Sequence, residues 1–171
     1  MLLTVLLCVN YNQIEKIFYP TEYSEYVEKY SNEYKVDKYL IYSIIKTESK
    51  FDPYAVSSKG ASGLMQITEK TALWASKELN IKDVDIYDPE TNIRIGTWYF
   101  HRLNKEFKGN LSLMISAYNG GSGNVRKWLK SSKYSDDGKS LIQIPFKETS
   151  QYTEKVLKNY RKYIEIYVYS K

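Results

Sequence analysis

The spacing of the apolar residues is the strongest constraint on the fold of this sequence. Along most of the chain they recur every three or four positions, which is the spacing of one face of an α-helix. A half-buried strand would alternate every second residue, and no stretch does so for long. Only residues 13–20 and the segment before Pro145 give no clear pattern. We therefore expect an all-α fold with little or no β structure.

Local signals divide this pattern into successive helices. Asp37, Thr68 and Asp88 precede apolar-periodic runs and are favourable N-cap residues. The helices expected are around 23–34, from Asp37 to Glu48, from Thr68 to Leu79, from Pro89 to Phe107, from Leu111 to Tyr118, around 125–129 and from about 147 to 169. Three tryptophans are expected in the core and the wall of the cleft: Trp74, Trp98 and Trp128.

The composition restricts the chemistry available to the chain. Its single cysteine, Cys8, excludes a disulfide framework, and its single histidine, His101, excludes a multi-histidine metal centre. If the protein is an enzyme, carboxylates must therefore carry the reaction. The net charge of +5 suits an anionic matrix, but the lysines are scattered among acidic residues and no nucleic-acid motif is present. We therefore expect neither a metal nor a nucleic-acid partner.

The chain reads as one domain, residues 21–171, preceded by a short hydrophobic segment and connector, residues 1–20. No internal repeat or Pro/Gly/Ser-rich linker divides the larger part. Residues 1–9 are apolar apart from Thr4, and as a helix they would reach only about 14 Å, too short to span a membrane alone. They are either part of a longer export signal or membrane anchor, or a hydrophobic end that packs on the domain.

Glu48 is the most informative acidic residue. It continues the apolar stripe of Leu40, Ile41, Ile44 and Ile45, so its carboxyl group should point toward the interior of the protein. Burial disfavours the charged form of a carboxyl, and a protonated carboxyl near neutral pH can act as a general acid. The alternative is a helix-end glutamate paired with Lys46 or Lys50.

Two further motifs suggest a binding cleft. The run from Gly60 to Gln66 contains small residues that allow a ligand close to the backbone, followed by one amide side chain. Tyr118 and Asn119 place a ring and an amide at a helix end, a pairing suited to a sugar. The alternative for Asn119 is a helix C-cap, which Asn and Gly also favour.

Taken together, these residues resemble the soluble lytic transglycosylase (SLT) domains, which are related to goose-type lysozyme. The motifs that carry the resemblance occur in order: Glu48-Ser49, Gly63-Leu64-Met65-Gln66, Ala117-Tyr118-Asn119 and Glu148-Thr149 to Tyr152. It extends over about residues 23 to 168 and includes the Asn92–Gly96 segment. Two positions depart from the usual pattern, Gly120 after Asn119 and Thr153 after Tyr152.

The resemblance implies a lysozyme-like α-helical domain with a cleft, which cleaves the MurNAc–GlcNAc β-1,4 bond of peptidoglycan without a cofactor. Glu48 matches the catalytic acid/base of the family. The positions that match its substrate-binding and site-shaping residues are Ser49, Met65, Gln66, Tyr118, Asn119, Glu148 and Tyr152. It further implies a monomer that acts on glycan strands outside the cytoplasm, in the cell envelope or wall.

Most glycosidases use two carboxylates, whereas only Glu48 is strongly indicated here. Asp52 is better explained by the turn that it forms with Pro53. An internal nucleophile, the C6 hydroxyl of MurNAc, would then attack and leave a 1,6-anhydro sugar. A hydrolytic muramidase, a non-catalytic cell-wall-binding domain and a basic nucleic-acid binder remain as alternatives.

Overall fold

The structure is a computed structural model that describes residues 13–170. Its helices are α2 (Ser24–Tyr34), α3 (Lys38–Glu48), α4 (Glu69–Leu79), α5 (Pro89–Glu106), α6 (Leu111–Gly120), α7 (Ser122–Leu129), α8 (Lys147–Ile164) and the π-helix η1 (Glu165–Tyr169). Within the described residues, β structure is limited to isolated bridges in the loop between α3 and α4. The all-α prediction is therefore confirmed, and the long final helix is continued by a π-helix at its end.

The capping residues act as the sequence predicts. The Asp37 side chain accepts a hydrogen bond from the backbone N–H of Tyr39, and Thr68 and Asp88 each accept one from a backbone N–H in the first turn of their helices. Asn110 caps α6 in the same way, a cap that the sequence pattern alone did not reveal. Local chemistry therefore sets where these helices begin.

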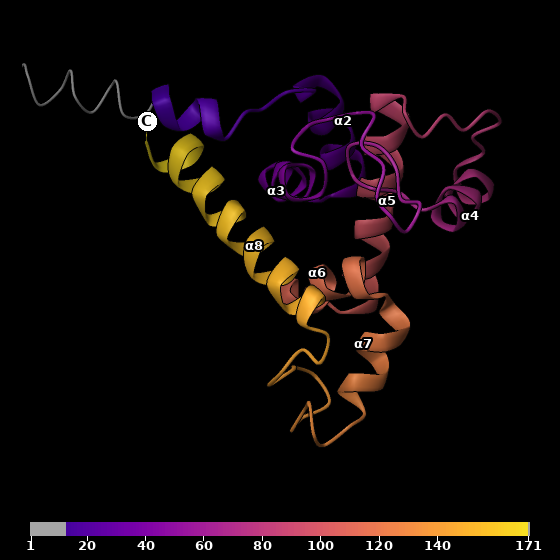
Figure 1. The fold of residues 1–171 in the computed structure, drawn as a ribbon, viewed down its shortest axis with the longest axis vertical. Coiled ribbons are helices and arrows are strands. Elements are labelled where there is room, and N and C mark those ends of the chain that lie inside the picture. The colour runs from indigo at the N-terminus through magenta and orange to yellow at the C-terminus, as the bar shows by residue number, and fades with distance from the viewer. Residues whose placement is uncertain (1–12, 171) are drawn as a thin grey trace, which may run out of the picture.

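Helix α3 lies in the core of the fold. It packs against α8 and α2, while α5 packs against α2, α4 and α6 (Figure 1). Residues Leu40 to Ile45 of α3 are all buried. In Figure 1, α8 runs as a long yellow helix from the region of α6 and α7 toward the helical turn at residues 13–18. This packing holds the C-terminal end of α3 between α8 and the loop that joins α3 to α4.

The segment before α2 is attached to the end of the chain. The Tyr163 hydroxyl donates a hydrogen bond to the Pro20 carbonyl oxygen at 2.8 Å, and the Tyr167 hydroxyl donates one to the Tyr19 carbonyl oxygen at 2.7 Å. Lys162 also forms an ion pair with Glu15. The described part of the connector therefore contacts α8 and η1, whereas the apolar residues 1–9 and Cys8 lie outside the described residues.

The three tryptophans do not share one environment. Trp98 and Trp128 are buried in the core, whereas Trp74 is 38% exposed and lies in the wall of a cavity. The reason is that α4 packs only along one narrow face, where it buries Ala72 and Ala75. The ring of Trp74 contacts Trp98 edge-on, with 4.8 Å between centroids, and Arg102 lies over it, while part of its surface stays exposed.

Candidate active site

Glu48 is the last residue of α3, and its carboxyl group is partly buried. The Tyr152 hydroxyl on α8 donates a hydrogen bond of 2.7 Å to Glu48 Oε1. Burial raises the pKa of Glu48 to about 7, although the Tyr152 hydrogen bond and the charge of Lys155 act in the opposite direction. The side chain can therefore carry a proton near neutral pH and can also release it.

The alternative ion pair at the end of α3 is not formed. Lys46 instead donates a hydrogen bond to the carbonyl oxygen of Phe18, and no ion pair joins Glu48 to Lys46 or Lys50. The buried stripe of α3, continued one turn further, leads the Glu48 carboxyl toward Tyr152 on the neighbouring helix.

Ser49 connects this acid to the loop that follows α3. Its side chain is buried, and its one hydroxyl proton is shared between the carbonyl oxygens of Leu64, at 2.8 Å, and Ile45, at 3.2 Å. Both contacts are internal to the protein. In this structure Ser49 holds the loop against the end of α3, and its hydroxyl is already engaged.

The loop at residues 63–66 is held from behind by Asn92 of α5. The Asn92 side chain accepts a hydrogen bond from the Met65 N–H at 2.8 Å and donates to the carbonyl oxygens of Ser62 and Ile86 at 3.0 and 2.7 Å. Gly63 has φ +77°, and a Cβ there would lie 2.2 Å from Asn92 Nδ2. Only glycine can combine this conformation with such close packing.

Met65 lies on the inner side of this loop. Its side chain is fully buried and packs so closely on Gly96 of α5 that a Cβ at Gly96 would lie 2.4 Å from the Met65 sulfur. The side chain predicted to line the cleft therefore supports the loop from within. A ligand at this loop would meet Gln66 and the backbone.

Gln66 and Tyr118 form one side of a small cavity. Gln66 Nε2 donates hydrogen bonds to the carbonyl oxygens of Ala55 and Gly63, which leaves its Oε1 without a partner among the described residues. The Tyr118 hydroxyl donates to the Met65 carbonyl oxygen at 2.8 Å. With Asn119 they contribute to the lining of a cavity of about 220 Å³.

Asn119 brings a complementary group to the same cavity. Its Oδ1 accepts a hydrogen bond of 2.8 Å from the hydroxyl of Thr149, a buried residue of α8. No described residue accepts a hydrogen bond from the Asn119 amide nitrogen. The cavity therefore presents a free acceptor on Gln66 and a free donor on Asn119, which suits a ligand with hydroxyl or amide groups.

Glu148 and Tyr152 lie one helical turn apart near the start of α8 but in different environments. Tyr152 is buried against Glu48, whereas Glu148 is exposed and forms an ion pair with Lys59 at 2.8 Å. That pair links α8 to the loop between α3 and α4. The structure thus brings five of the predicted site residues together: Glu48, Gln66, Tyr118, Asn119 and Tyr152. Glu148 lies at the outer edge of this group. The roles of these residues toward a ligand stay predictions.

Sequence reasoning gave no role in the site to three residues that shape it: Asn92, Thr149 and Lys59. Asn92 offered a signal, because an asparagine inside a helix is unfavourable unless its amide has a specific partner. Thr149 belongs to the Glu148-Thr149 motif, but its contact with Asn119 joins segments distant in the sequence, as does the contact of Lys59 with Glu148, for which no signal existed. Among residues 13–170, no three His, Cys, Asp or Glu side chains are grouped so that they could hold a metal ion, and none of the helices could span a bilayer.

Comparison with known proteins gives a consistent result. The profile of the Transglycosylase SLT domain family matches residues 25–141. The soluble lytic murein transglycosylase of Escherichia coli K12 is 35% identical over 144 residues, which cover 81% of this chain and 22% of that protein. The membrane-bound lytic murein transglycosylase C of Edwardsiella ictaluri is 36% identical over 128 residues, covering 66% of this chain and 34% of the relative.

Solved structures agree with the sequence comparison. The 70 kDa soluble lytic transglycosylase of E. coli superposes with a TM-score of 0.77 at 31% identity, over 88% of this chain and 25% of that one. An inactive mutant of the lytic transglycosylase Slt of Pseudomonas aeruginosa gives a TM-score of 0.76 at 30% identity, covering 88% of this chain and 25% of that one. The aligned regions thus span about a fifth to a third of these longer proteins. The profile match, the identities and the fold agree that this chain belongs to the transglycosylase SLT domain family.

Proposed function

We propose that this chain is a peptidoglycan lytic transglycosylase that cleaves the MurNAc–GlcNAc β-1,4 bond and leaves 1,6-anhydro-MurNAc ends. The observation that carries the proposal is the partly buried Glu48, whose pKa is raised to about 7 and whose carboxyl lies against Tyr152. Membership of the SLT domain family supports the same activity, since the relatives bear the name lytic murein transglycosylase.

The reaction that we propose uses Glu48 twice. Glu48 first donates its proton to the glycosidic oxygen as the bond between that oxygen and C1 of MurNAc breaks. The resulting carboxylate then takes the proton from the C6 hydroxyl of the same sugar, and O6 forms a bond to C1. The first proton stays on the leaving sugar and the C6 hydroxyl proton replaces it on Glu48, so the enzyme is regenerated and no water is consumed.

The internal attack is supported by the lack of a second well-placed carboxyl among residues 13–170. Asp52 is exposed and accepts a hydrogen bond from the Tyr54 N–H in a turn, and Glu148 is paired with Lys59. A nucleophile on the substrate avoids bringing a water molecule into the site. A tethered group of this kind lowers the barrier by several kcal/mol, roughly 7 to 11 in the best cases.

Replacing Glu48 by Gln tests the assignment. Gln keeps the shape of the side chain but cannot transfer a proton, so we expect glycan-cleaving activity to fall by about a thousandfold or more while the circular dichroism spectrum stays unchanged. Asp52→Asn is the matched carboxyl-to-amide control and should keep most of the activity. A folded Glu48→Gln protein that still cleaves sacculi at the parental rate would overturn the assignment.

Product analysis separates the proposal from its enzymatic competitor. Mass spectrometry of the released fragments should show 1,6-anhydro ends, which are one water lighter than the reducing ends of a hydrolytic muramidase. If Asp52→Asn were as damaging as Glu48→Gln and the ends were reducing, a two-carboxylate hydrolase would be the better description. Binding to sacculi without any release of fragments would indicate a non-catalytic wall-binding domain.

We also propose that the domain acts outside the cytoplasm on glycan strands, and that its N-terminal segment associates with the membrane. The described turn at residues 13–18 supports this, because Ile14, Ile17 and Phe18 are all more than half exposed. Replacing these three residues by Ser should abolish co-sedimentation with lipid vesicles, with cleavage of isolated sacculi as the control. Equal sedimentation of the variant would contradict membrane association by this segment.

A further inference from the structure

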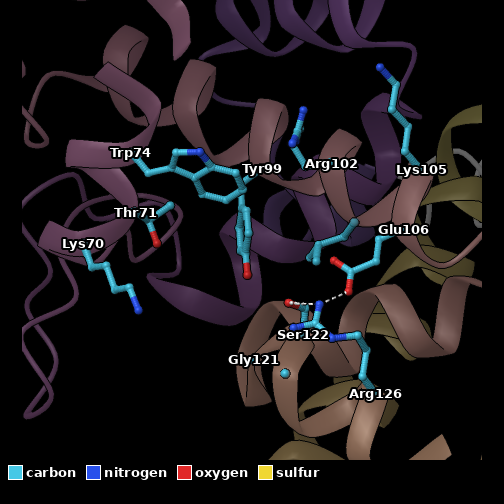
Figure 2. Close-up of a pocket in the computed structure, with 12 residues that line it drawn as sticks. Lys70, Thr71, Trp74, Tyr99, Arg102, Lys105, Glu106, Gly121, Ser122 and Arg126 are labelled. Atoms are coloured by element: carbon cyan, nitrogen blue, oxygen red, sulfur yellow. Dashed lines mark hydrogen bonds and ion pairs between the residues drawn. The ribbon is translucent and has the colours of Figure 1, made fainter. Parts of the chain in front are cut away.

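A large cavity next to the active site has no role in the reaction described above. It lies between α4, α5 and α7, has a volume of about 800 Å³ and shares Thr71, Tyr99 and Gly121 with the smaller cavity of the site. Figure 2 shows Lys70, Thr71 and Trp74 on one side, Ser122 and Arg126 on the other, and the Tyr99 ring between them. The two cavities therefore form one continuous surface for a ligand.

Aromatic rings line the path from the active site into this cavity. The Tyr118 ring lies 5.5 Å from that of Tyr99, and the Tyr99 ring lies 6.1 Å from Trp74 at an angle of 75°. The Tyr99 hydroxyl has no hydrogen-bond partner among the described residues. This path therefore offers apolar contact along its length, with polar groups free to bind a ligand.

The side chains that line the cavity carry mostly positive charge. Its lining includes four cationic side chains, Lys70, Arg102, Lys105 and Arg126, and one carboxylate, Glu106. Glu106 is already ion-paired with Arg126. Arg102 lies over the Trp74 ring at 5.5 Å, and neither Lys70 nor Lys105 forms an ion pair with a described residue. The lining therefore carries a net positive charge, with Lys70 at its edge and with Arg102 and Lys105 directed away from the space between Trp74 and Arg126 (Figure 2).

We propose that this cavity binds the carboxylate-bearing peptide that branches from the glycan strand, and that it makes the enzyme prefer strands whose peptide carboxylates are free over strands whose carboxylates are amidated. The inference rests on the proposed function. Neutral sugar hydroxyls gain little from several unpaired cations, whereas carboxylates form charge-assisted hydrogen bonds with Lys and Arg. A volume of about 800 Å³ is large enough for a short peptide, within the roughly 300 to 1,000 Å³ of ligand pockets.

The test compares two substrates made from one batch of purified peptidoglycan. One half keeps its peptide carboxylates, and the other is converted to amides with carbodiimide and ammonia; kcat/KM is measured on both from the release of anhydro-muropeptides. We expect the parental protein to prefer the carboxylate form about tenfold at low salt. The preference should decline as ionic strength rises, because exposed charges are screened.

Variants locate the preference in the cavity. The double change Lys70→Gln with Arg102→Gln should reduce the substrate ratio to about one. Lys127→Gln removes one charge from an exposed position on α7 outside the cavity lining, and it should leave the ratio unchanged. Thermal melting of each variant checks that the fold is retained.

The outcomes separate this inference from the function on which it depends. Equal kcat/KM on both substrates, or an unchanged ratio in the double variant, overturns the peptide site while the transglycosylase proposal stands. No cleavage of either substrate by the parental protein overturns the proposed function and the peptide site with it. A ratio that falls equally in Lys127→Gln also overturns the site, since general surface charge would then explain the preference.

Discussion

Helices α3 and α4 are equally long and follow each other in the chain, yet they serve the fold differently. Each has 11 residues and a side-chain N-cap. Helix α3 buries six consecutive residues, whereas α4 buries only Ala72 and Ala75 and leaves Leu73 58% exposed. The difference arises because α3 packs against α2 and α8, while α4 packs mainly against α5.

The two helices suit two different roles, positioning an acid and presenting a surface to a ligand. A general acid needs a partly dehydrated position that does not move, and the end of a buried helix provides one. A surface for a branched, charged ligand needs exposed rings and cationic side chains, and a helix attached by one narrow face can present them. The loop held by Asn92 joins these two environments.

The largest expected effect compares core substitutions in the two helices. Ile44→Ala in α3 removes a fully buried side chain and should lower the free energy of unfolding by about 2 to 4 kcal/mol. Trp74→Ala in α4 loses an edge contact with Trp98 and partial burial, so we expect about 1 kcal/mol or less. Urea denaturation measures both changes. Equal losses in the free energy of unfolding would mean that α4 contributes as much to stability as α3 does.

A second prediction concerns the loop between the helices. Asn92→Ala would remove the partner of the Met65 N–H and of the Ile86 carbonyl oxygen, and one of the two hydrogen bonds to the Ser62 carbonyl oxygen, which also accepts from the Ile67 N–H. We expect a loss of roughly 2 to 3 kcal/mol in the free energy of unfolding, because unsatisfied buried polar groups are costly. Activity should fall as well, since Gln66 lies on this loop. Asn104→Ala, at a half-buried position further along α5, is the control and should change stability little.

A third prediction uses the titration of Glu48. Its pKa of about 7 in the folded protein exceeds the ordinary value of 4.5, so the unfolded chain loses this proton first as pH rises. The stability of the parental protein should therefore decrease, through this group, between about pH 4.5 and 7. Glu48→Gln has no buried carboxyl to ionise. It should therefore be more stable than the parental protein at pH 8 by roughly 1 to 3 kcal/mol, with little difference at pH 4. A stabilisation independent of pH would contradict the buried acid.

The smallest effect tests the contact between α3 and α8. Tyr152→Phe removes the hydrogen bond that lowers the pKa of Glu48, so that pKa should rise. The decline of kcat/KM at high pH should then move to higher pH, while the fold is retained. Tyr160 is on the same helix as Tyr152, and its hydroxyl donates a hydrogen bond to Asp37. Tyr160→Phe removes that hydroxyl and should leave the pH profile unchanged. An unchanged profile in Tyr152→Phe would show that this hydrogen bond does not tune the acid.

Much of the fold could be predicted because its signals are local. The caps at Asp37, Thr68 and Asp88 depend on neighbouring residues alone, and each helix begins where they indicate. The candidate acid was likewise visible from the stripe that precedes it. The orientation of Met65 was not, because the position of a loop side chain depends on what packs behind it, here Gly96.

By itself the sequence determined the helices, the absence of a Cys- or His-based centre and the position of one inward-facing acid. Only the tertiary structure decided that the acid meets Tyr152, which is 104 positions away, and that Trp74 is open to solvent beside a cationic cavity. The physical reason is the distance along the sequence over which each kind of interaction acts. Caps and helical periodicity act over a few residues, whereas burial, pKa and cavities depend on which distant elements the packing brings together.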